Sequence, residues 1–238
     1  MSSPATTSLI ERLFKAGAHF GFKKSRRHPT VTPFLFATKQ GNDIIDLEQS
    51  ARLIEEAKTA VRGMTSAAKV VLFVATKEEA APLVRALAEK LGAPYVVNRW
   101  IGGMLTNWSE IKKRIARMAE LAREQESGEL ERKYTKKERV ILGREAEKLA
   151  VYFGGIKSLT KIPDLLVVVD PRHDHIAVTE ATEMKIPVVG IMSSDSNVAK
   201  VTYPIVVNDA LQTSVSAVLA ELAAAHTEGV TAAAAPRA

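Results

Sequence analysis

The chain has 238 residues, 46% of them hydrophobic, and its 33 Lys and Arg against 27 Asp and Glu give a net charge of +6. This apolar content is enough for a globular core, and the positive surplus favours an anionic partner such as nucleic acid over a small neutral ligand. The sequence contains no Cys, which excludes disulfides and thiolate metal sites. It shows neither a signal-peptide pattern nor an apolar run of roughly 18 residues, so we expect a cytoplasmic protein.

The first predicted element is a helix over residues 8–15, and it runs into the most basic segment of the chain. Between Arg12 and Asn42 the sequence has seven Lys or Arg residues and no Asp or Glu. Residues 22–29 fit neither a helical nor a strand period, and Pro29 disfavours helical backbone at His28, so a loop is predicted there. Concentrated positive charge without acidic neighbours indicates a site for a polyanion; the alternative is a solvated basic loop that binds nothing.

A short strand pair is predicted next, at residues 34–37 and 43–47, with Gly41 and Asn42 in the turn between the strands. Beyond it, short β-branched runs alternate with amphipathic helical stretches. The strands are expected at 69–76, 95–97, 165–170, 187–192 and 205–207, and the helices at 78–91, 176–184 and 210–225. This alternation predicts an open parallel α/β sheet with helices on both faces, three layers in all.

A long charged insertion separates the second of these strands from the third. Between Glu110 and Lys148 it contains twelve Lys or Arg and nine Glu residues, and Thr135 with Glu138 forms a capping box near its middle. Apolar residues recur at spacings of three and four on both sides of that box: Ile111, Ile115, Met118 and Ala122 before it, and Leu142, Ala146, Leu149 and Phe153 after it. We therefore predict two antiparallel helices packed as a short coiled coil, whose charges form either a solvated face or a binding face.

These elements predict one discontinuous α/β domain, residues 1–107 and 151–228, with a basic N-terminal extension. The helical hairpin, residues 108–150, interrupts that domain. The Ala-rich tail, residues 229–238, is expected to be disordered.

Polar residues follow several predicted strands, at the sheet edge where open α/β folds bind ligands. They include Thr76, Asp170, Asp195 and Asp209. A nucleotide- or sugar-phosphate-dependent enzyme is therefore an alternative function, but no strand leads into a glycine-rich phosphate-binding loop, and we expect no catalysis and no cofactor. His173 and His175 lack a third ligand, so we expect no metal site and assign Asp174 as the N-cap of the following helix.

Arg99 and Trp100 follow the predicted strand at 95–97 and precede the glycine pair at 102–103. A guanidinium group can hold a phosphate with two hydrogen bonds, and an indole ring can stack on a base, so the two residues are a candidate RNA contact. The alternative is that Trp100 is buried against the base of the helical hairpin, where it braces the turn.

Several segments of the chain form a set of distinctive motifs in a fixed order. The most specific is Asn98–Trp108 (NRWIGGMLTNW), Gly17–Gly21 with Gln40–Leu47 precedes it, and segments at 153–157, 162–164 and 180–188 follow. In sequence and in order these motifs resemble those of the bacterial small-subunit ribosomal protein S2 family, and the resemblance covers residues 8–224. It implies a flavodoxin-like sheet, a non-enzymatic role between the head and body of the small subunit, contact with small-subunit ribosomal RNA, and help in recruiting ribosomal protein S1.

The basic loop departs from the family pattern. Lys23 stands where the family commonly has Gln, and Arg27 where it commonly has an aromatic residue. The loop is therefore more basic than usual, and the family's individual contacts are not carried over to it.

The resulting hypothesis is a structural RNA-binding protein of the small ribosomal subunit, in which cationic side chains neutralise phosphates and RNA shape gives specificity. The assigned RNA-binding residues are Lys23, Lys24, Arg26, Arg27, His28, Arg99, Trp100, Lys112, Lys113 and Arg114. A third alternative is a scaffold protein outside the ribosome whose hairpin binds a partner helix.

Overall fold

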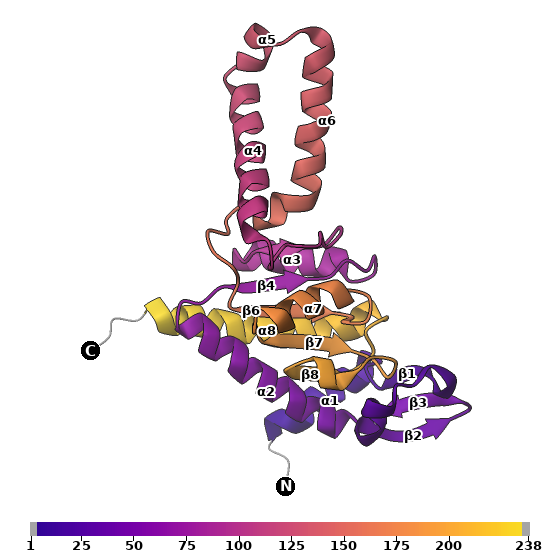
Figure 1. The fold of residues 1–238 in the computed structure, drawn as a ribbon. Helices are drawn as coiled ribbons and strands as arrows, with labels where there is room; N and C mark the ends of the chain where they lie inside the picture. The colour runs from indigo at the N-terminus through magenta and orange to yellow at the C-terminus, as the bar shows by residue number, and fades with distance from the viewer. Residues whose placement is uncertain (1–3, 235–238) are drawn as a thin grey trace.

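The protein, described here over residues 4–234 of a computed structural model, is built on a five-stranded parallel sheet (Figure 1). The strands are β4 (Val71–Val74), β5 (Tyr95–Val96), β6 (Leu165–Val169), β7 (Val188–Met192) and β8 (Tyr203–Val206). They lie side by side in the order β5-β4-β6-β7-β8. This order is that of flavodoxin-like folds, so the predicted fold class is confirmed.

Helices cover both faces of the sheet because successive residues of each strand point to opposite sides. One face packs against α1 (Pro4–Lys15), α2 (Leu47–Ser66), α3 (Ala81–Leu91) and α8 (Gln212–Ala234). Val71 and Phe73 belong to that face, whereas Leu72 and Val74 pack toward α7 (His175–Glu183) and the base of the hairpin. The two apolar cores hold the strand ends, and the polar loops that follow them, in fixed positions.

Helix α2 occupies a stretch for which no helix was expected. Its N-cap is Asp46, whose carboxylate accepts hydrogen bonds from the backbone N–H groups of Glu48 (2.9 Å) and Gln49 (3.3 Å). Leu47 and Ile54 then lie on its buried face. Both the cap and this helical spacing of apolar residues are visible in the sequence. Helix α2 could therefore have been predicted, and the sequence analysis missed it.

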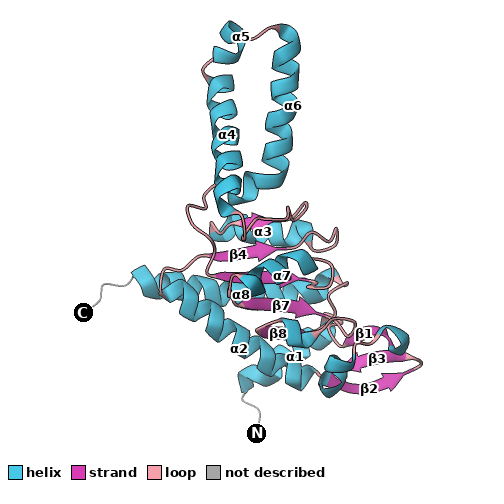
Figure 2. Cartoon of the chain, viewed as in Figure 1, coloured by secondary structure: helices cyan, strands magenta, loops and turns pink. Residues whose placement is uncertain are grey.

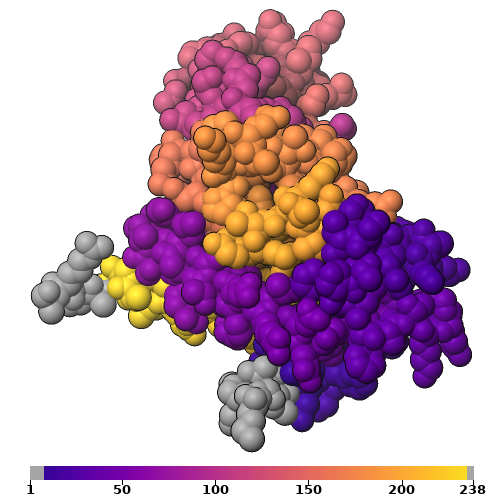
Figure 3. All heavy atoms as spheres, turned by 60° about the horizontal axis from the view of Figure 1, so that its bottom comes forward, coloured from indigo at the N-terminus to yellow at the C-terminus, as the bar shows by residue number. Residues whose placement is uncertain are grey.

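The basic N-terminal segment forms a small antiparallel sheet of its own. Its strands are β1 (Phe20–Lys23), β2 (Leu35–Lys39) and β3 (Asn42–Ile45), in the order β1-β3-β2. The predicted strand pair is therefore present, and the predicted loop begins as strand β1 and continues in a 3-10 turn over Lys24–Arg26. This unit, indigo in Figure 3, lies against the end of the main sheet formed by β7 and β8, where the His28 N–H donates to the Ser194 carbonyl (2.9 Å).

The insertion is a helical hairpin that stands out from the opposite end of the sheet (Figure 2). It consists of α4 (Trp108–Glu126), the short α5 (Glu129–Lys133) and α6 (Lys136–Phe153). The capping box of Thr135 and Glu138 is confirmed at the start of α6. On α4, Leu121 is buried and the predicted Ala122 is exposed, so the apolar stripe shifts by one residue near the tip.

The final helix is longer than expected, since residues 229–234 of the predicted disordered tail continue α8. Gly229 allows α8 to lie close to α2, where an added Cβ would be 2.7 Å from the Arg62 carbonyl oxygen. The ion pair of Arg62 with Glu228 (2.8 Å) adds to this contact. Residues 235–238 of the predicted tail lie outside the described residues. Among residues 4–234, no helix has the length and apolar character needed to cross a membrane.

Candidate nucleic-acid interface

The basic loop is held on the protein by one of its own arginines. Arg27 makes two hydrogen bonds to the carboxylate of Asp43 and a third to Thr38 (2.6 Å), and the Asp43 side chain is 0% exposed. The hydrogen bonds from Arg27 lower the pKa of Asp43 despite its burial, so this carboxylate is ionised at neutral pH. Arg27 was predicted as a phosphate ligand, and the structure places it in a largely buried ion pair.

Arg26 also interacts with other residues of the protein. Its guanidinium group donates to Asp195 (3.0 Å), which follows β7, and it lies 4.3 Å from the centre of the Phe22 ring. By contrast, Lys23 and Lys24 are exposed, and neither makes an ion pair with any described residue. The loop therefore presents two uncommitted ammonium groups on a backbone that Arg26 and Arg27 hold in place.

The Asn98–Trp108 motif folds around a buried carboxylate. Both oxygens of Glu180, on α7, accept hydrogen bonds: one from the Trp100 indole N–H (3.0 Å) and the Gly103 N–H (2.8 Å), the other from the Leu105 N–H (2.9 Å) and Thr106. Burial raises the pKa of Glu180, but these hydrogen bonds outweigh it and lower the pKa overall. The motif is thus a loop closed on an anion of the protein itself.

Trp100 is 5% exposed, and the ring that was assigned to base stacking lies inside this closed loop. Of its two predicted roles, the structure matches the bracing of the turn. Arg99 beside it is exposed and makes no ion pair with a described residue, so a cation is still presented at this position.

Three cations follow at the start of α4. Lys113 pairs with Glu110 one turn earlier (2.6 Å), which is an ordinary surface ion pair of a helix. Lys112 and Arg114 are exposed and unpaired among the described residues. The first arm of the hairpin therefore presents two available positive charges on the helix that the loop after Arg99 leads into.

The ten assigned residues form two groups that do not meet. Residues 23–28 lie beside β7 and β8, whereas Arg99, Trp100 and residues 112–114 lie at the base of the hairpin, beside the opposite strand β5 (Figure 1). The structure adds two cations near the first group, Arg172 after β6 and Lys200 after β7, that were not selected from the sequence. Each is an isolated cation in its own part of the sequence, so nothing in the local sequence marks it as part of a basic site. The fold brings both residues beside the basic loop.

The crevice that flavodoxin-like folds use for ligands is lined here by polar side chains that pair with one another. It lies beyond the ends of β4 and β6, where the strand order reverses. There the carboxylate of Asp174 accepts hydrogen bonds from the N–H (3.1 Å) and hydroxyl (2.6 Å) of Thr76, and Lys77 pairs with Asp170 (3.1 Å). Asp174 was predicted to cap α7 with its side chain and instead joins the end of β4 to α7.

The remaining strand-end carboxylate, Asp209, is buried 3.7 Å from Lys77. Burial and the nearby Asp170 raise its pKa to about 7. Within residues 4–234, no cluster of three or more His, Asp or Glu side chains has the arrangement of a metal site.

Comparison with known proteins identifies one family over almost the whole chain. The profile of the Ribosomal protein S2 family matches residues 13–229. A protein of Picosynechococcus, the small ribosomal subunit protein uS2, is 40% identical over 90% of this chain and 83% of its own length. The small ribosomal subunit protein uS2c of Rhodomonas salina is 41% identical over 94% of this chain and 92% of its own.

Proposed function

The chain belongs to the ribosomal protein S2 family, and from that membership we propose that it binds small-subunit ribosomal RNA through the loop at residues 23–28. Members of the family are structural components of the small ribosomal subunit, and this chain is one of them. Its proposed seat is between the head and body of the subunit, in cytoplasmic ribosomes. The base of the hairpin, with Arg99, Lys112 and Arg114, is proposed as a second RNA contact.

The observation that carries the RNA-binding proposal is that the arginines of the basic loop form ion pairs within the protein and its lysines do not. Asp43 and Asp195 form ion pairs with Arg27 and Arg26, whereas Lys23 and Lys24 remain exposed and unpaired among the described residues. An ammonium group held at a fixed place on a rigid loop gives up less entropy on binding a phosphate than one on a mobile loop. The paired arginines thus support the shape of the loop, and the two lysines are its proposed phosphate ligands.

The test is the salt dependence of binding between the full chain and small-subunit ribosomal RNA. Each neutralised phosphate contributes roughly 0.7 to 0.9 to the slope of log K against log salt, so replacing Lys23 and Lys24 by Ala should reduce the slope by about 1.4 to 1.8. The Lys69→Ala, Lys90→Ala variant is the control because both residues are exposed and equally reduce the net charge. An unchanged slope in the loop variant, or an equal loss in the control, would show that the loop is not the RNA contact.

Recruitment of ribosomal protein S1 is proposed at a different surface, an exposed aromatic cluster next to the loop. The cluster consists of Phe14, His19 and Phe20; His19 stacks on Phe14 at 4.5 Å and contacts Phe20 at 4.0 Å between ring centres. Phe14 is 61% and Phe20 is 52% exposed. Burial lowers the pKa of His19, which keeps its ring neutral at pH 7. An exposed, uncharged aromatic surface favours a protein partner over RNA phosphates.

Replacing Phe14 and Phe20 by Ser should lower the amount of S1 on purified small subunits several-fold while the amount of this chain stays the same, because the aromatic contact area is lost. Quantitative mass spectrometry of the subunits measures both proteins. Phe36→Ser is the matched control, since Phe36 is 77% exposed but lies on β2, outside the cluster. Normal S1 occupancy in the double variant would rule out this surface.

A further inference from the structure

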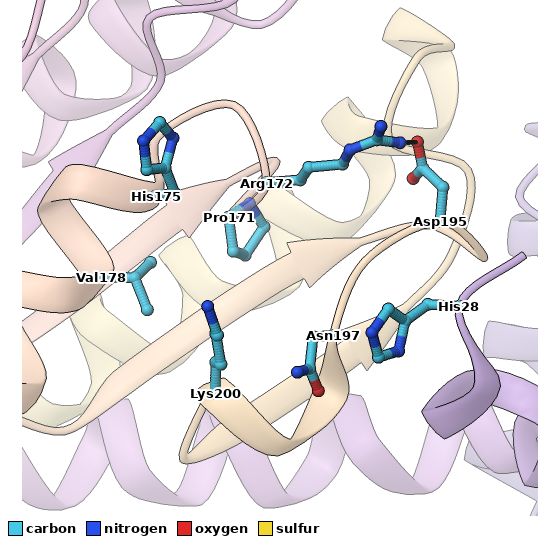
Figure 4. A pocket seen from close by; sticks show the side chains of 8 residues that line it. All are labelled: His28, Pro171, Arg172, His175, Val178, Asp195, Asn197 and Lys200. Carbon is cyan, nitrogen blue, oxygen red and sulfur yellow. Dashed lines mark hydrogen bonds and ion pairs between the residues drawn. The ribbon is translucent and has the colours of Figure 1, made fainter. Parts of the chain in front are cut away.

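A cavity of about 260 Å³ lies between the ends of β6 and β7 (Figure 4). It adjoins the crevice at β4 and β6, whose lining also includes Arg172, His175 and Asp195. Its walls come from the basic loop, the start of α7 and the turn after β7. The lining residues are His28, Pro171, Arg172, His175, Val178, Asp195, Asn197 and Lys200.

The charged side chains around this cavity carry more positive than negative charge. Arg26 and Arg172 share one oxygen of Asp195, at 3.0 Å and 2.5 Å, so a single carboxylate faces two guanidinium groups. Each guanidinium carries five N–H donors, and most of them remain available. Lys200 is exposed and forms no ion pair with a described residue, and its ammonium group points into the cavity in Figure 4.

Neutral donors face the same space. The side-chain oxygen of Asn197 accepts from the Ala199 N–H (3.0 Å) and the Thr30 hydroxyl (3.4 Å), which leaves the Asn197 amide N–H₂ to donate. The first turn of α7 begins at His175 without a side-chain cap, because Asp174 is bonded to Thr76. The imidazoles of His28 and His175 complete the wall.

We propose that this cavity binds the phosphate group of a ribonucleotide. Its excess of cationic and N–H donors suits an anion and excludes a metal cation, and its size accommodates a phosphate with part of its sugar. Because His28 belongs both to the cavity and to the basic loop, an RNA strand on the loop can place a phosphate here without crossing a gap. The inference rests on the proposed function for the source of that phosphate, and a free nucleotide carries the same group.

The test uses the full chain and an Arg172→Ala, Lys200→Ala variant. Both side chains are exposed, so the variant is expected to fold, and its circular dichroism and Tm verify this. Inorganic phosphate and a nucleoside monophosphate are titrated while the NMR signals of the His28 and His175 rings are followed. The salt slope for small-subunit ribosomal RNA is measured in parallel, with Lys69→Ala, Lys90→Ala as the charge-matched control.

For the wild type we expect either titrant, or the RNA, to shift both histidine signals, and we expect the variant to lose that response. If RNA is the source, the variant's salt slope also falls by about 1.4 to 1.8, whereas a response to the free nucleotide with an unchanged slope identifies a free nucleotide as the ligand. Histidine signals that respond to neither the titrants nor RNA overturn the proposal. That failure is distinct from failure of the proposed function, because the Lys23 and Lys24 variant reports on the loop separately.

Discussion

Asp209 lies just after β8 and its side chain is buried. The ammonium group of Lys77 is near it but also pairs with Asp170. Neither oxygen of its carboxylate accepts a hydrogen bond of ordinary geometry from a described residue, although the nearby Ser193 backbone acts to lower the pKa of Asp209. A charge in that setting is poorly stabilised, which is why burial, followed by the nearby Asp170, raises the pKa of Asp209 to about 7. In the unfolded chain the pKa of an Asp is about 3.9.

The sign of the resulting pH dependence follows from these two values. The folded state keeps the proton on Asp209 at pH values where the unfolded state has released it, so this group stabilises the fold at low pH and the stabilisation is lost as the pH rises toward 7. Asp209→Asn is permanently uncharged. Its free energy of unfolding should match the wild type near pH 4 and exceed it at pH 8 by roughly 4 kcal/mol.

Urea titrations at several pH values measure this difference, and taking the difference between two chains cancels the groups they share. Glu183→Gln is the control, because Glu183 is an exposed acid whose removal should give no such trend. A constant gap between Asp209→Asn and the wild type from pH 4 to 8 would mean that Asp209 is ionised in the folded protein throughout.

Residue identities alone predicted where positive charge gathers but not which charges are available. Arg26 and Arg27 are indistinguishable in sequence from Lys23 and Lys24 as cations. Their partners decide the difference, and one of them, Asp195, comes from a strand end 169 residues away in the chain. Such pairings depend on the tertiary fold. The sequence therefore predicted which residues make the loop basic, and the structure was needed to show which of their charges are free to bind a ligand.

At the level of elements, the loop at residues 99–107 and helix α7 behave as one unit. Glu180 joins them because backbone N–H groups of the loop converge on its carboxylate. The loop leads directly into α4, so this anion fixes the point from which the hairpin leaves the sheet. Hydrogen bonds to a buried charged group contribute more than neutral ones, on the order of 1.5 to 3 kcal/mol each.

Glu180→Gln keeps the shape of the side chain but replaces one accepting oxygen with an N–H₂ donor that faces other donors. We expect the free energy of unfolding to fall by roughly 2 to 4 kcal/mol, and the fluorescence of Trp100 to shift to longer wavelength as its indole becomes hydrated. Glu183→Gln, on the exposed face of the same helix, is the control for fluorescence and stability. Unaltered stability would show that the loop does not depend on this carboxylate.

The elements themselves were largely predictable, because periodic apolar patterns fix them locally. The five strands of the main sheet and the two hairpin helices lie close to their expected positions, and the capping box at Thr135 marks the start of α6. The exceptions are instructive. Strand β1 pairs with β3, and α8 extends past residue 228, where Gly229 packs on α2. Neither contact leaves a local signal of the kind that a cap or a heptad does.

At the scale of the whole molecule, the assigned RNA-binding cations that make no ion pair with a described residue lie at two separated places. Lys23 and Lys24 lie beside β8, whereas Lys112 and Arg114 lie at the root of the hairpin beside β5, with the width of the sheet between them (Figure 1). A rigid body of this kind can bridge two segments of a folded RNA without changing shape. The arrangement therefore favours recognition of RNA shape over recognition of a short sequence.

If one RNA contacts both places at once, the effects of substitutions at the two places can be predicted quantitatively. Because the two pairs share no partner and are distant, their effects on RNA binding should add. Replacing Lys112 and Arg114 by Ala should reduce the salt slope by about 1.4 to 1.8, and replacing all four residues should reduce it by about 2.8 to 3.6. Filter binding of small-subunit ribosomal RNA across a salt series measures each slope.

The same series separates this arrangement from its alternatives. If the hairpin bound a partner helix rather than RNA, the Lys112 and Arg114 variant would keep the wild-type salt slope. The variant with all four residues replaced would then have the same slope as the Lys23 and Lys24 variant. If the two places bound RNA in alternation, the fourfold variant would abolish binding although each pair alone lost little. Additive slopes are expected only when one RNA spans the sheet from β8 to the hairpin and neutralises both groups at once.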